Sequence, residues 1–233
     1  MLTTIDGKMG QGKSTFATFS AISEQLIGGK KIFSTMHLSN ATRCVICGDM
    51  HAVREINGSE YYECTAKGDT PETRVLKEVE ASDVTRIEYT FLTFEDFTKL
   101  MSVAEEDPTS ITNCAFILDE AYLFMSSRNS ASKMNRIFNT FVFQTRKRGV
   151  NAYMTTHSVD RLDKWVRESI DIKVSVRFNP ESRLVRARIR DMHTGARAVK
   201  HIRLGEVMGF YDTKEIVVPG GKLYKVSEEY AKQ

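Results

Sequence analysis

The fold is decided by the stretch Gly7-Lys8-Met9-Gly10-Gln11-Gly12-Lys13-Ser14, which matches the phosphate-loop pattern G-x-x-x-x-G-K-[ST] in full. An apolar run over Leu2–Asp6 precedes it and predicts a strand. Apolar residues three and four positions apart follow over 13–27 and predict one face of a helix. Glycines let the loop curl so that successive N–H groups face phosphates, and the helix turns its positive end toward them. The stretch therefore predicts a strand, a phosphate-binding loop and a helix.

Individual residues of this loop have distinct expected roles. The Lys13 ammonium would reach the β and γ phosphates of ATP, and the Ser14 hydroxyl would ligate Mg²⁺. We expect nucleotide contacts from the whole stretch and the residue after it: Gly7, Lys8, Met9, Gly10, Gln11, Gly12, Lys13, Ser14 and Thr15.

A second motif, Ala115-Phe116-Ile117-Leu118-Asp119-Glu120, follows about a hundred residues later. A buried strand here delivers acids at its carboxyl end, where open α/β sheets bind ligands. Asp119 would hold Mg²⁺ through water. Glu120 would orient and deprotonate the attacking water. The two motifs together predict an enzyme that hydrolyses ATP.

Lys8 leaves a different class open. Lys-x-Gly-x-Gly-Lys-Ser also resembles the deviant phosphate loop of the MinD/ParA family, whose extra lysine reaches across a dimer. Those proteins usually have glycine where Met9 stands, and they lack a glutamate directly after the magnesium aspartate, whereas Glu120 is present here. We therefore interpret Lys8 as a solvated loop residue.

The composition and the order of patterns predict one soluble domain over 1–233. Of its 233 residues, 41% are apolar and 27% charged, which is ordinary for a globular protein, and no run approaches the ~20 apolar residues of a membrane span. The N-terminus does not have the pattern of a signal peptide, and a net charge of +3 is too small to indicate a nucleic-acid partner by itself.

Strands and helices alternate along the chain, which predicts a mostly parallel α/β sheet. Further strands are expected at Lys31–Thr35, Arg86–Phe91, Asn113–Leu118, Val150–Thr156 and Ile170–Phe178, helices at Phe94–Val103, Ser132–Arg146 and Val159–Glu168, and a C-terminal hairpin from Leu184–Arg190 and Arg197–Leu204.

Residues 41–85 are expected to form a small inserted subdomain that binds zinc. Cys44-Val45-Ile46-Cys47-Gly48 has the shape of a zinc-ribbon knuckle, in which two thiolates chelate one ion and glycine allows the tight turn. Cys64 follows at ribbon spacing, but Lys67 stands where a fourth cysteine belongs. The fourth ligand is then His51, the nearest histidine, or His37. Four cysteines used in this way fit a reducing compartment better than a disulfide framework.

A basic stripe marks the hairpin. Arg186, Arg188 and Arg190 alternate with apolar residues, which on a strand places three guanidinium groups on one face. Such a face could grip the phosphates of DNA. It could equally be a solvated sheet surface or an interface with acidic residues of a neighbouring subunit.

Residues 144–157, QTRKRGVNAYMTTH, resemble the FtsK–HerA superfamily of DNA-pumping ATPases, in which a helix ends in Ala-Arg-x-x-Gly and a strand ends in the polar sensor. The likeness covers the phosphate loop, Asp119-Glu120 and 142–178, with a weaker echo in Tyr211-Asp212-Thr213. It implies a RecA-like core. Viral members include genome-packaging ATPases and zonular-occludens-toxin-like assembly ATPases of filamentous phages.

The resemblance also implies a ring, usually a hexamer, with ATP bound between subunits and completed by a neighbour's arginine. Arg146 is the first candidate for that arginine, Arg148 the second and Arg128 the third. His157 stands at the usual sensor position, where the family has glutamine.

These observations favour an ATP-driven ring motor that moves double-stranded DNA into a viral capsid. ATP, Mg²⁺ and structural Zn²⁺ are its expected cofactors, and capsid or vertex proteins its expected partners, in the host cytoplasm or at the virion vertex. One alternative is a zonular-occludens-toxin-like assembly or export ATPase; members of that type often carry a membrane span, and none is found here. The other is a MinD/ParA-like dimeric switch.

Overall fold

A computed structural model describes residues 1–64, 75–107, 109–123, 125, 133–211, 215–216 and 224–225. Arg128, Asp212 and Thr213 lie outside these residues. Among the helices described, none has the length and apolar character that crossing a bilayer requires.

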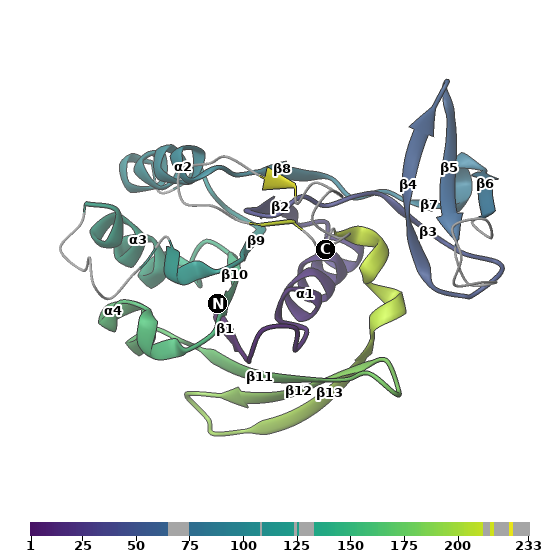
Figure 1. The fold of residues 1–233 in the computed structure, drawn as a ribbon. Coiled ribbons are helices and arrows are strands. Elements are labelled where there is room, and N and C mark those ends of the chain that lie inside the picture. Colours follow the sequence, from purple (N-terminus) through teal and green to yellow (C-terminus); the bar gives the residue numbers. More distant parts are fainter. Residues whose placement is uncertain are drawn as a thin grey trace.

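An eight-stranded sheet forms the centre of the molecule, in the order β13-β12-β11-β1-β10-β9-β2-β8 (Figure 1). The six strands from β11 to β8 run parallel, while β12 and β13 add an antiparallel edge. This arrangement confirms the expected mostly parallel α/β sheet and its C-terminal hairpin. The strands are β1 Leu2–Asp6, β2 Lys31–Ser34, β8 Tyr89–Phe91, β9 Cys114–Leu118, β10 Asn151–Thr156, β11 Ile172–Asn179, β12 Leu184–Asp191 and β13 Arg197–Arg203.

Helices cover both faces of this sheet, so the core has two parts. The helix α1, Lys13–Gly28, packs on one face through Phe16 and Ile22. The other face is covered by α2 (Phe94–Glu106), α3 (Lys133–Gln144) and α4 (Lys164–Glu168) (Figure 1). Buried strand residues alternate between the two parts; Phe116 belongs to the second and Ile117 to the first. The central strands β1, β9 and β10 are therefore buried on both sides, as their continuous apolar runs predict.

Two expected elements are shorter than the patterns indicate. The strand expected over Arg86–Phe91 begins only at Tyr89, because the amides of Ile87 and Glu88 donate to the side chains of Asn40 and Gln25 instead. The helix expected over Val159–Glu168 divides into a 3₁₀ turn, η5 Val159–Arg161, and α4. Asp163 separates them, because its carboxylate accepts the amide of Trp165 and caps α4.

A second, five-stranded antiparallel sheet stands beside the central one at the right of Figure 1, in the order β6-β5-β4-β3-β7. The chain enters it after β2 and returns to the central sheet at β8, beside β2. Its buried apolar cluster is small, with Cys44, Tyr62 and Cys64 at the centre. The elements of this second sheet are β3 Ala41–Arg43, β4 Met50–Ile56, β5 Ser59–Cys64, β6 Val75–Val79, the turn η2 Ala81–Asp83 and β7 Val84–Thr85.

The remaining elements lie outside both sheets. They are the 3₁₀ turns η3 Ala121–Leu123, η6 Leu204–Glu206 and η7 Met208–Phe210, and a two-stranded antiparallel pair formed by β14 Glu215–Ile216 and β15 Tyr224–Lys225.

Candidate active site

The phosphate loop joins the carboxyl end of β1 to α1, and its shape is fixed from outside as well as by its own glycines. Gly10 and Gly12 adopt left-handed φ values of 70° and 87°. A Cβ on Gly12 would lie 2.6 Å from Val185 Cγ2 of β12, so glycine is also required by this close approach. The amide of Phe178 in β11 donates to Gln11 Oε1 at 3.2 Å. Strands β11 and β12 therefore support the loop.

Ser14 and Asp119, which the two motifs place on magnesium, lie together in the fold. Ser14 Oγ donates to Asp119 Oδ1 at 2.9 Å. Thr155 of the neighbouring strand β10 donates to the same oxygen at 2.7 Å, and the Asp119 amide donates to Thr35 Oγ1 at 2.9 Å. A hydroxyl and a carboxylate are hard oxygen ligands, so this pair suits Mg²⁺.

Glu120 follows Asp119 with a left-handed φ of 51° and its amide donates to Thr155 Oγ1 at 2.9 Å. Burial, and then the charge of Asp119, raise the pKa of the Glu120 carboxyl, while His157 and Lys13 act against this rise. Its Oε2 atom is buried and finds no hydrogen-bond partner among the described residues. A carboxylate with a raised pKa and a free oxygen is suited to accept a proton.

Lys13 and Glu120 are linked through His157. Lys13 Nζ lies 3.4 Å from His157 Nδ1, and His157 Nε2 lies 3.3 Å from Glu120 Oε1. Since an ammonium group only donates, Nδ1 is the acceptor and the proton on Nε2 faces the carboxylate. Lys13 also donates to the backbone oxygen of Lys8, whereas the Lys8 side chain is exposed. The histidine at the expected sensor position thus contacts both catalytic candidates.

Thr35 and Thr155 of this site have no role assigned from the sequence, and Tyr211 entered only through the family resemblance. Thr35 and Thr155 orient the Asp119-Glu120 pair, as described above. Tyr211 OH lies 2.6 Å from Thr15 Oγ1, and both side chains are buried. Thr35 and Thr155 lie at the ends of strands that flank β9, which is the one sequence signal that could have identified them. The contact between Tyr211 and Thr15 has no local sequence signal, because the two residues lie 196 positions apart.

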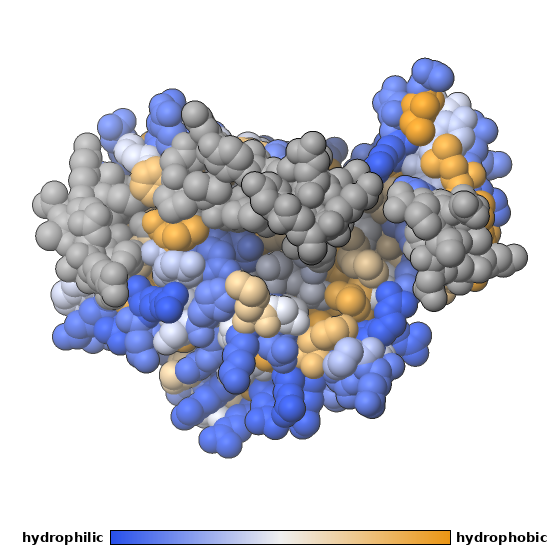
Figure 2. Space-filling model, viewed as in Figure 1, coloured by the Kyte–Doolittle hydropathy of each residue, from blue (hydrophilic) through white to orange (hydrophobic). Residues whose placement is uncertain are grey.

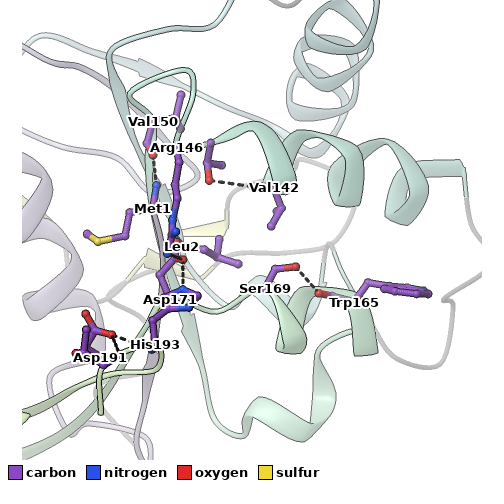
Figure 3. A network of polar contacts seen from close by, with 12 residues as sticks. Met1, Leu2, Val142, Arg146, Val150, Trp165, Ser169, Asp171, Asp191 and His193 are labelled. Carbon is purple, nitrogen blue, oxygen red and sulfur yellow. Dashed lines mark hydrogen bonds and ion pairs between the residues drawn. The ribbon is translucent and has the colours of Figure 1, made fainter. Parts of the chain in front are cut away.

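Arg146 contacts Asp171 beside Leu2, at the amino end of β1 (Figure 3), whereas the phosphate loop follows the carboxyl end of that strand. Its Nη2 contacts Asp171 Oδ1 at 2.5 Å, and His193 Nε2 reaches the same oxygen at 2.8 Å. The amide of Leu2, at the start of β1, donates to the other Asp171 oxygen at 2.7 Å. The Arg146 side chain is nevertheless 61% exposed. Within one subunit it cannot reach the loop that follows β1, but it is accessible to a neighbour.

Arg148, the second candidate for an arginine acting on a neighbouring subunit, is a structural residue instead. It is 6% exposed, and its guanidinium donates to the Ala104 backbone oxygen at 2.7 Å and to Gln144 Oε1 at 3.0 Å. It also lies over the Phe141 ring. These contacts join the end of α2 to α3, so Arg148 is unavailable to another subunit.

The four residues predicted to bind zinc converge in the insert. The ligand atoms of Cys44, Cys47, His51 and Cys64 all lie within 4.8 Å of one another. The alternative ligand His37 stacks on Phe91 instead, with ring centroids 4.0 Å apart. Three sulfurs and one imidazole are the donor set of a structural zinc site, and none of the four cysteines is in a disulfide.

The two thiols of the knuckle, Cys44 and Cys47, have different environments. Burial acts to raise the pKa of the Cys44 thiol, but the backbone amides of Cys47 and Ile46 donate to its sulfur and lower that pKa to about 7. Because metals bind the thiolate, this stabilisation favours binding at Cys44, whereas burial raises the pKa of Cys47 to about 11. Cys114, in contrast, is buried in β9, and burial raises its pKa to about 12, as befits a core residue.

Arg186, Arg188 and Arg190 lie exposed on one face of β12, as the alternation predicts, while Val185 and Ala187 face the core. The strand register brings further cations onto the same face. They are Lys173 and Arg177 of β11 and Arg197 of β13. In Figure 2, hydrophilic side chains project from the lower edge of the molecule, where β11, β12 and β13 lie in Figure 1. The arginine stripe is therefore part of a broader basic sheet face.

Comparison with known proteins decides the family. The model of the zonular occludens toxin (Zot) family matches residues 1–200. The chain belongs to the Zot family. Among solved structures, the N-terminal domain of zonular occludens toxin from Neisseria meningitidis shares 13% identity with it at a TM-score of 0.51, covering 91% of this chain and 98% of that one. The genome packaging NTPase B204 from Sulfolobus turreted icosahedral virus 2 shares 13% identity at a TM-score of 0.50, covering 85% and 94%. No curated protein matches the sequence significantly.

These matches confirm the fold class and the family resemblance. The Zot-family chain has a RecA-like P-loop core with an inserted cysteine-containing sheet and a C-terminal hairpin. It is a P-loop ATPase. The MinD/ParA-like alternative is set aside, because the family match covers the phosphate loop itself.

Proposed function

We propose that this Zot-family ATPase is a ring motor that hydrolyses ATP to move double-stranded DNA during virion assembly, with genome packaging as its task. The observation that carries the proposal is the 2.9 Å contact between Ser14 and Asp119, with Glu120 beside it. This contact joins the start of α1 to the carboxyl end of β9, where a nucleotide and its metal are expected.

In the proposed reaction, each residue has one task. Lys13 neutralises the β and γ phosphates, and Ser14 with Asp119 holds Mg²⁺, which when bound neutralises charge on the phosphate oxygens. Glu120 orients the attacking water and accepts its proton, since burial already raises the pKa of this carboxyl. His157, between Lys13 and Glu120, is proposed to sense the γ-phosphate, because its 3.4 Å contact with Lys13 must change when a phosphate binds the ammonium.

The position of Arg146 supports a ring. Its exposed guanidinium lies at the sheet end remote from its own phosphate loop. An arginine presented in this way can stabilise the transferring phosphoryl group only of a neighbouring subunit. We propose a homo-oligomeric ring, of six subunits as in the resembling superfamily, with ATP between subunits.

The basic sheet face is the proposed DNA contact. Six cations, from Lys173, Arg177, Arg186, Arg188, Arg190 and Arg197, share one surface. A duplex carries one phosphate charge per ~1.7 Å, so such a face can bind it without reading its sequence. The opposite side of β12 contacts the phosphate loop through Val185, which gives DNA binding a direct route to the ATP site.

We further propose a structural Zn²⁺ at Cys44, Cys47, His51 and Cys64. The convergence of four ligand atoms within 4.8 Å supports it. The insert buries little apolar surface, and a small subdomain of this kind usually needs metal binding as part of its folding energy. Because the cysteines form no disulfide and the substrate is ATP, we propose that the protein works in the reducing cytoplasm of the host, with capsid or vertex proteins as docking partners.

The second candidate is an assembly or export ATPase that extrudes virions rather than filling capsids. The match to the zonular occludens toxin family favours it. The discriminating experiment measures ATP turnover with and without duplex DNA. The motor proposal predicts that DNA stimulates turnover, and equal rates over a range of DNA concentrations would favour the assembly ATPase.

A further inference from the structure

Residues 204–211 connect the zinc cluster to the ATP site. At one end, this segment touches strand β4 backbone to backbone. A Cβ on Gly209 would lie 2.6 Å from the carbonyl carbon of Met50 and 2.7 Å from the amide nitrogen of His51. A Cβ on Gly205 would lie 1.9 Å from Asp49 Oδ1. Gly209 has no room for a side chain because it meets backbone atoms, whereas Gly205 meets only the movable Asp49 carboxylate. The position of the segment therefore depends, through Gly209, on where the backbone of Met50 and His51 lies.

At the other end, the same segment reaches the nucleotide site. Only Phe210 separates Gly209 from Tyr211, whose hydroxyl lies 2.6 Å from Thr15 Oγ1. Burial raises the pKa of Tyr211, so its hydroxyl stays protonated and keeps this hydrogen bond. Thr15 follows Ser14 in the first turn of α1. A shift at Tyr211 is therefore felt directly at the phosphate-binding end of the helix.

The knuckle is a tight turn whose two ends carry proposed zinc ligands. The Gly48 amide donates to the Cys44 oxygen at 2.9 Å, and the Cys44 amide donates to the Asp49 oxygen at 2.8 Å. Cys47 and His51 flank Gly48–Met50, so one ion bound to both would fix the residues that Gly205 and Gly209 touch. Arg183, which precedes β12, adds a 2.8 Å ion pair to Asp49.

We propose that the zinc-bound knuckle positions Tyr211, and that Tyr211 positions Thr15 for nucleotide binding, so that zinc loading sets the affinity for ATP. This inference rests on the proposed ATP and zinc sites. Tyr211 acts here as a positioning residue: it touches Thr15 and not the groups that cleave the phosphate bond. Its loss is expected to raise KM for ATP and to leave kcat unchanged.

The first test removes the hydroxyl groups. Tyr211→Phe keeps the ring in the core and is expected to raise KM and the Kd of a fluorescent ATP analogue by about 3- to 10-fold, the effect of one hydrogen bond. Thr15→Val should do the same, and the double variant should be no worse than either single one. Thr15→Ser, which keeps the hydroxyl, should bind almost as the wild type does. Additive losses in the double variant, or a fall in kcat with KM unchanged, would overturn the positioning role.

The second test acts on the knuckle. The Kd of the ATP analogue and the zinc content are measured on intact protein before chelation, after chelation, and after Zn²⁺ is returned. Affinity is expected to fall at least 3-fold on chelation and to return with zinc. Gly209→Ala should lower affinity and zinc retention together, whereas Gly28→Ala, where a Cβ meets no atom within 4 Å, should change neither. Should Gly209→Ala fail to fold, the chelation series and Tyr211→Phe still decide.

The outcomes separate the inference from the function on which it rests. Wild-type protein that contains zinc but binds no nucleotide would refute the ATPase proposal itself. Wild-type protein that binds nucleotide equally well with and without zinc would refute only the coupling.

Discussion

Val185 of the basic strand packs directly on Gly12 of the phosphate loop: a single methyl group added at Gly12 would lie 2.6 Å from Val185 Cγ2. The next residue, Arg186, points to the opposite face of β12. One strand thus carries the proposed DNA contact on one side and a loop contact on the other. If the proposed DNA contact is correct, β12 would connect DNA binding to the ATP site within a single layer of the protein.

Replacing Arg186, Arg188 and Arg190 together with glutamine should weaken duplex binding alike for all sequences. Each lost phosphate contact should also flatten the slope of log K against log salt by about 0.9. Basal ATPase activity should persist, since Val185 remains in place, while stimulation by DNA should fall. Titrations of labelled duplex at several salt concentrations measure both effects.

The matched control replaces Arg54, Lys99 and Lys164, three exposed cations on other elements, with glutamine. It changes the net charge equally and should keep the full salt slope. If both triple variants lose the same slope, DNA binding reflects overall charge and the basic face has no special role.

Glu120→Gln should stop turnover and leave ATP binding nearly intact. The amide cannot accept the proton from water, but Lys13, Ser14 and Asp119 still hold the phosphates and the metal. Lys13→Ala should instead weaken binding, because it removes a direct phosphate contact. Single-turnover rates and analogue affinities of both variants distinguish these effects, and an equal loss of rate and affinity in Glu120→Gln would exclude Glu120 as the base.

Glu120 should also reduce stability at neutral pH. Its folded-state pKa is raised above the unfolded value, so between those two values the folded protein binds more protons and loses stability as pH rises. Glu120→Gln should therefore melt at a higher temperature than the wild type at pH 7. The difference should shrink as pH falls toward the unfolded pKa of the carboxyl. Melting curves across this range check the sign, and a Gln variant less stable than wild type at pH 7 would contradict it.

Arg146→Ala subunits should be folded and inactive alone, yet regain activity when mixed with Glu120→Gln subunits. In mixed rings some interfaces combine an intact Glu120 with an intact Arg146. Arg148→Ala offers a contrast, since loss of its buried contacts to Gln144 and Ala104 should lower the melting temperature. Rings shown to be mixed but without any regained turnover would leave Arg146 as the partner of Asp171 alone.

The insert should bind about one zinc per chain. Elemental analysis of protein purified without chelator measures this, and chelation should lower the melting temperature because the binding energy is folding energy. Cys47→Ser should lose the metal, whereas Cys114→Ala, outside the cluster, should retain it. Metal-free wild-type protein, or a melting temperature indifferent to chelation, would eliminate the zinc site.

The extent of sequence prediction differs between local and distant features. The phosphate loop, the Asp119-Glu120 pair and the cysteine knuckle are local patterns, and each lies where its motif implies. The contacts of Tyr211 with Thr15 and of Val185 with Gly12 join segments far apart in the chain, so only the strand order brings them together. Arg146 and Arg148 show the same limit. They lie two positions apart in sequence but differ in burial. After the end of α3 the chain turns Arg148 toward Ala104 in the interior, whereas Arg146 points toward Asp171 and stays exposed.

Displacement of a labelled third strand from a DNA triplex reports whether this ATPase moves along the duplex. A motor that tracks along the duplex strips the third strand as it moves. Wild-type protein with ATP and Mg²⁺ is predicted to release the strand, while Glu120→Gln and the Arg186, Arg188 and Arg190 triple variant release none. Rapid ATP hydrolysis by the wild type on the same triplex, with the third strand remaining bound, would contradict the proposal that this ATPase moves DNA.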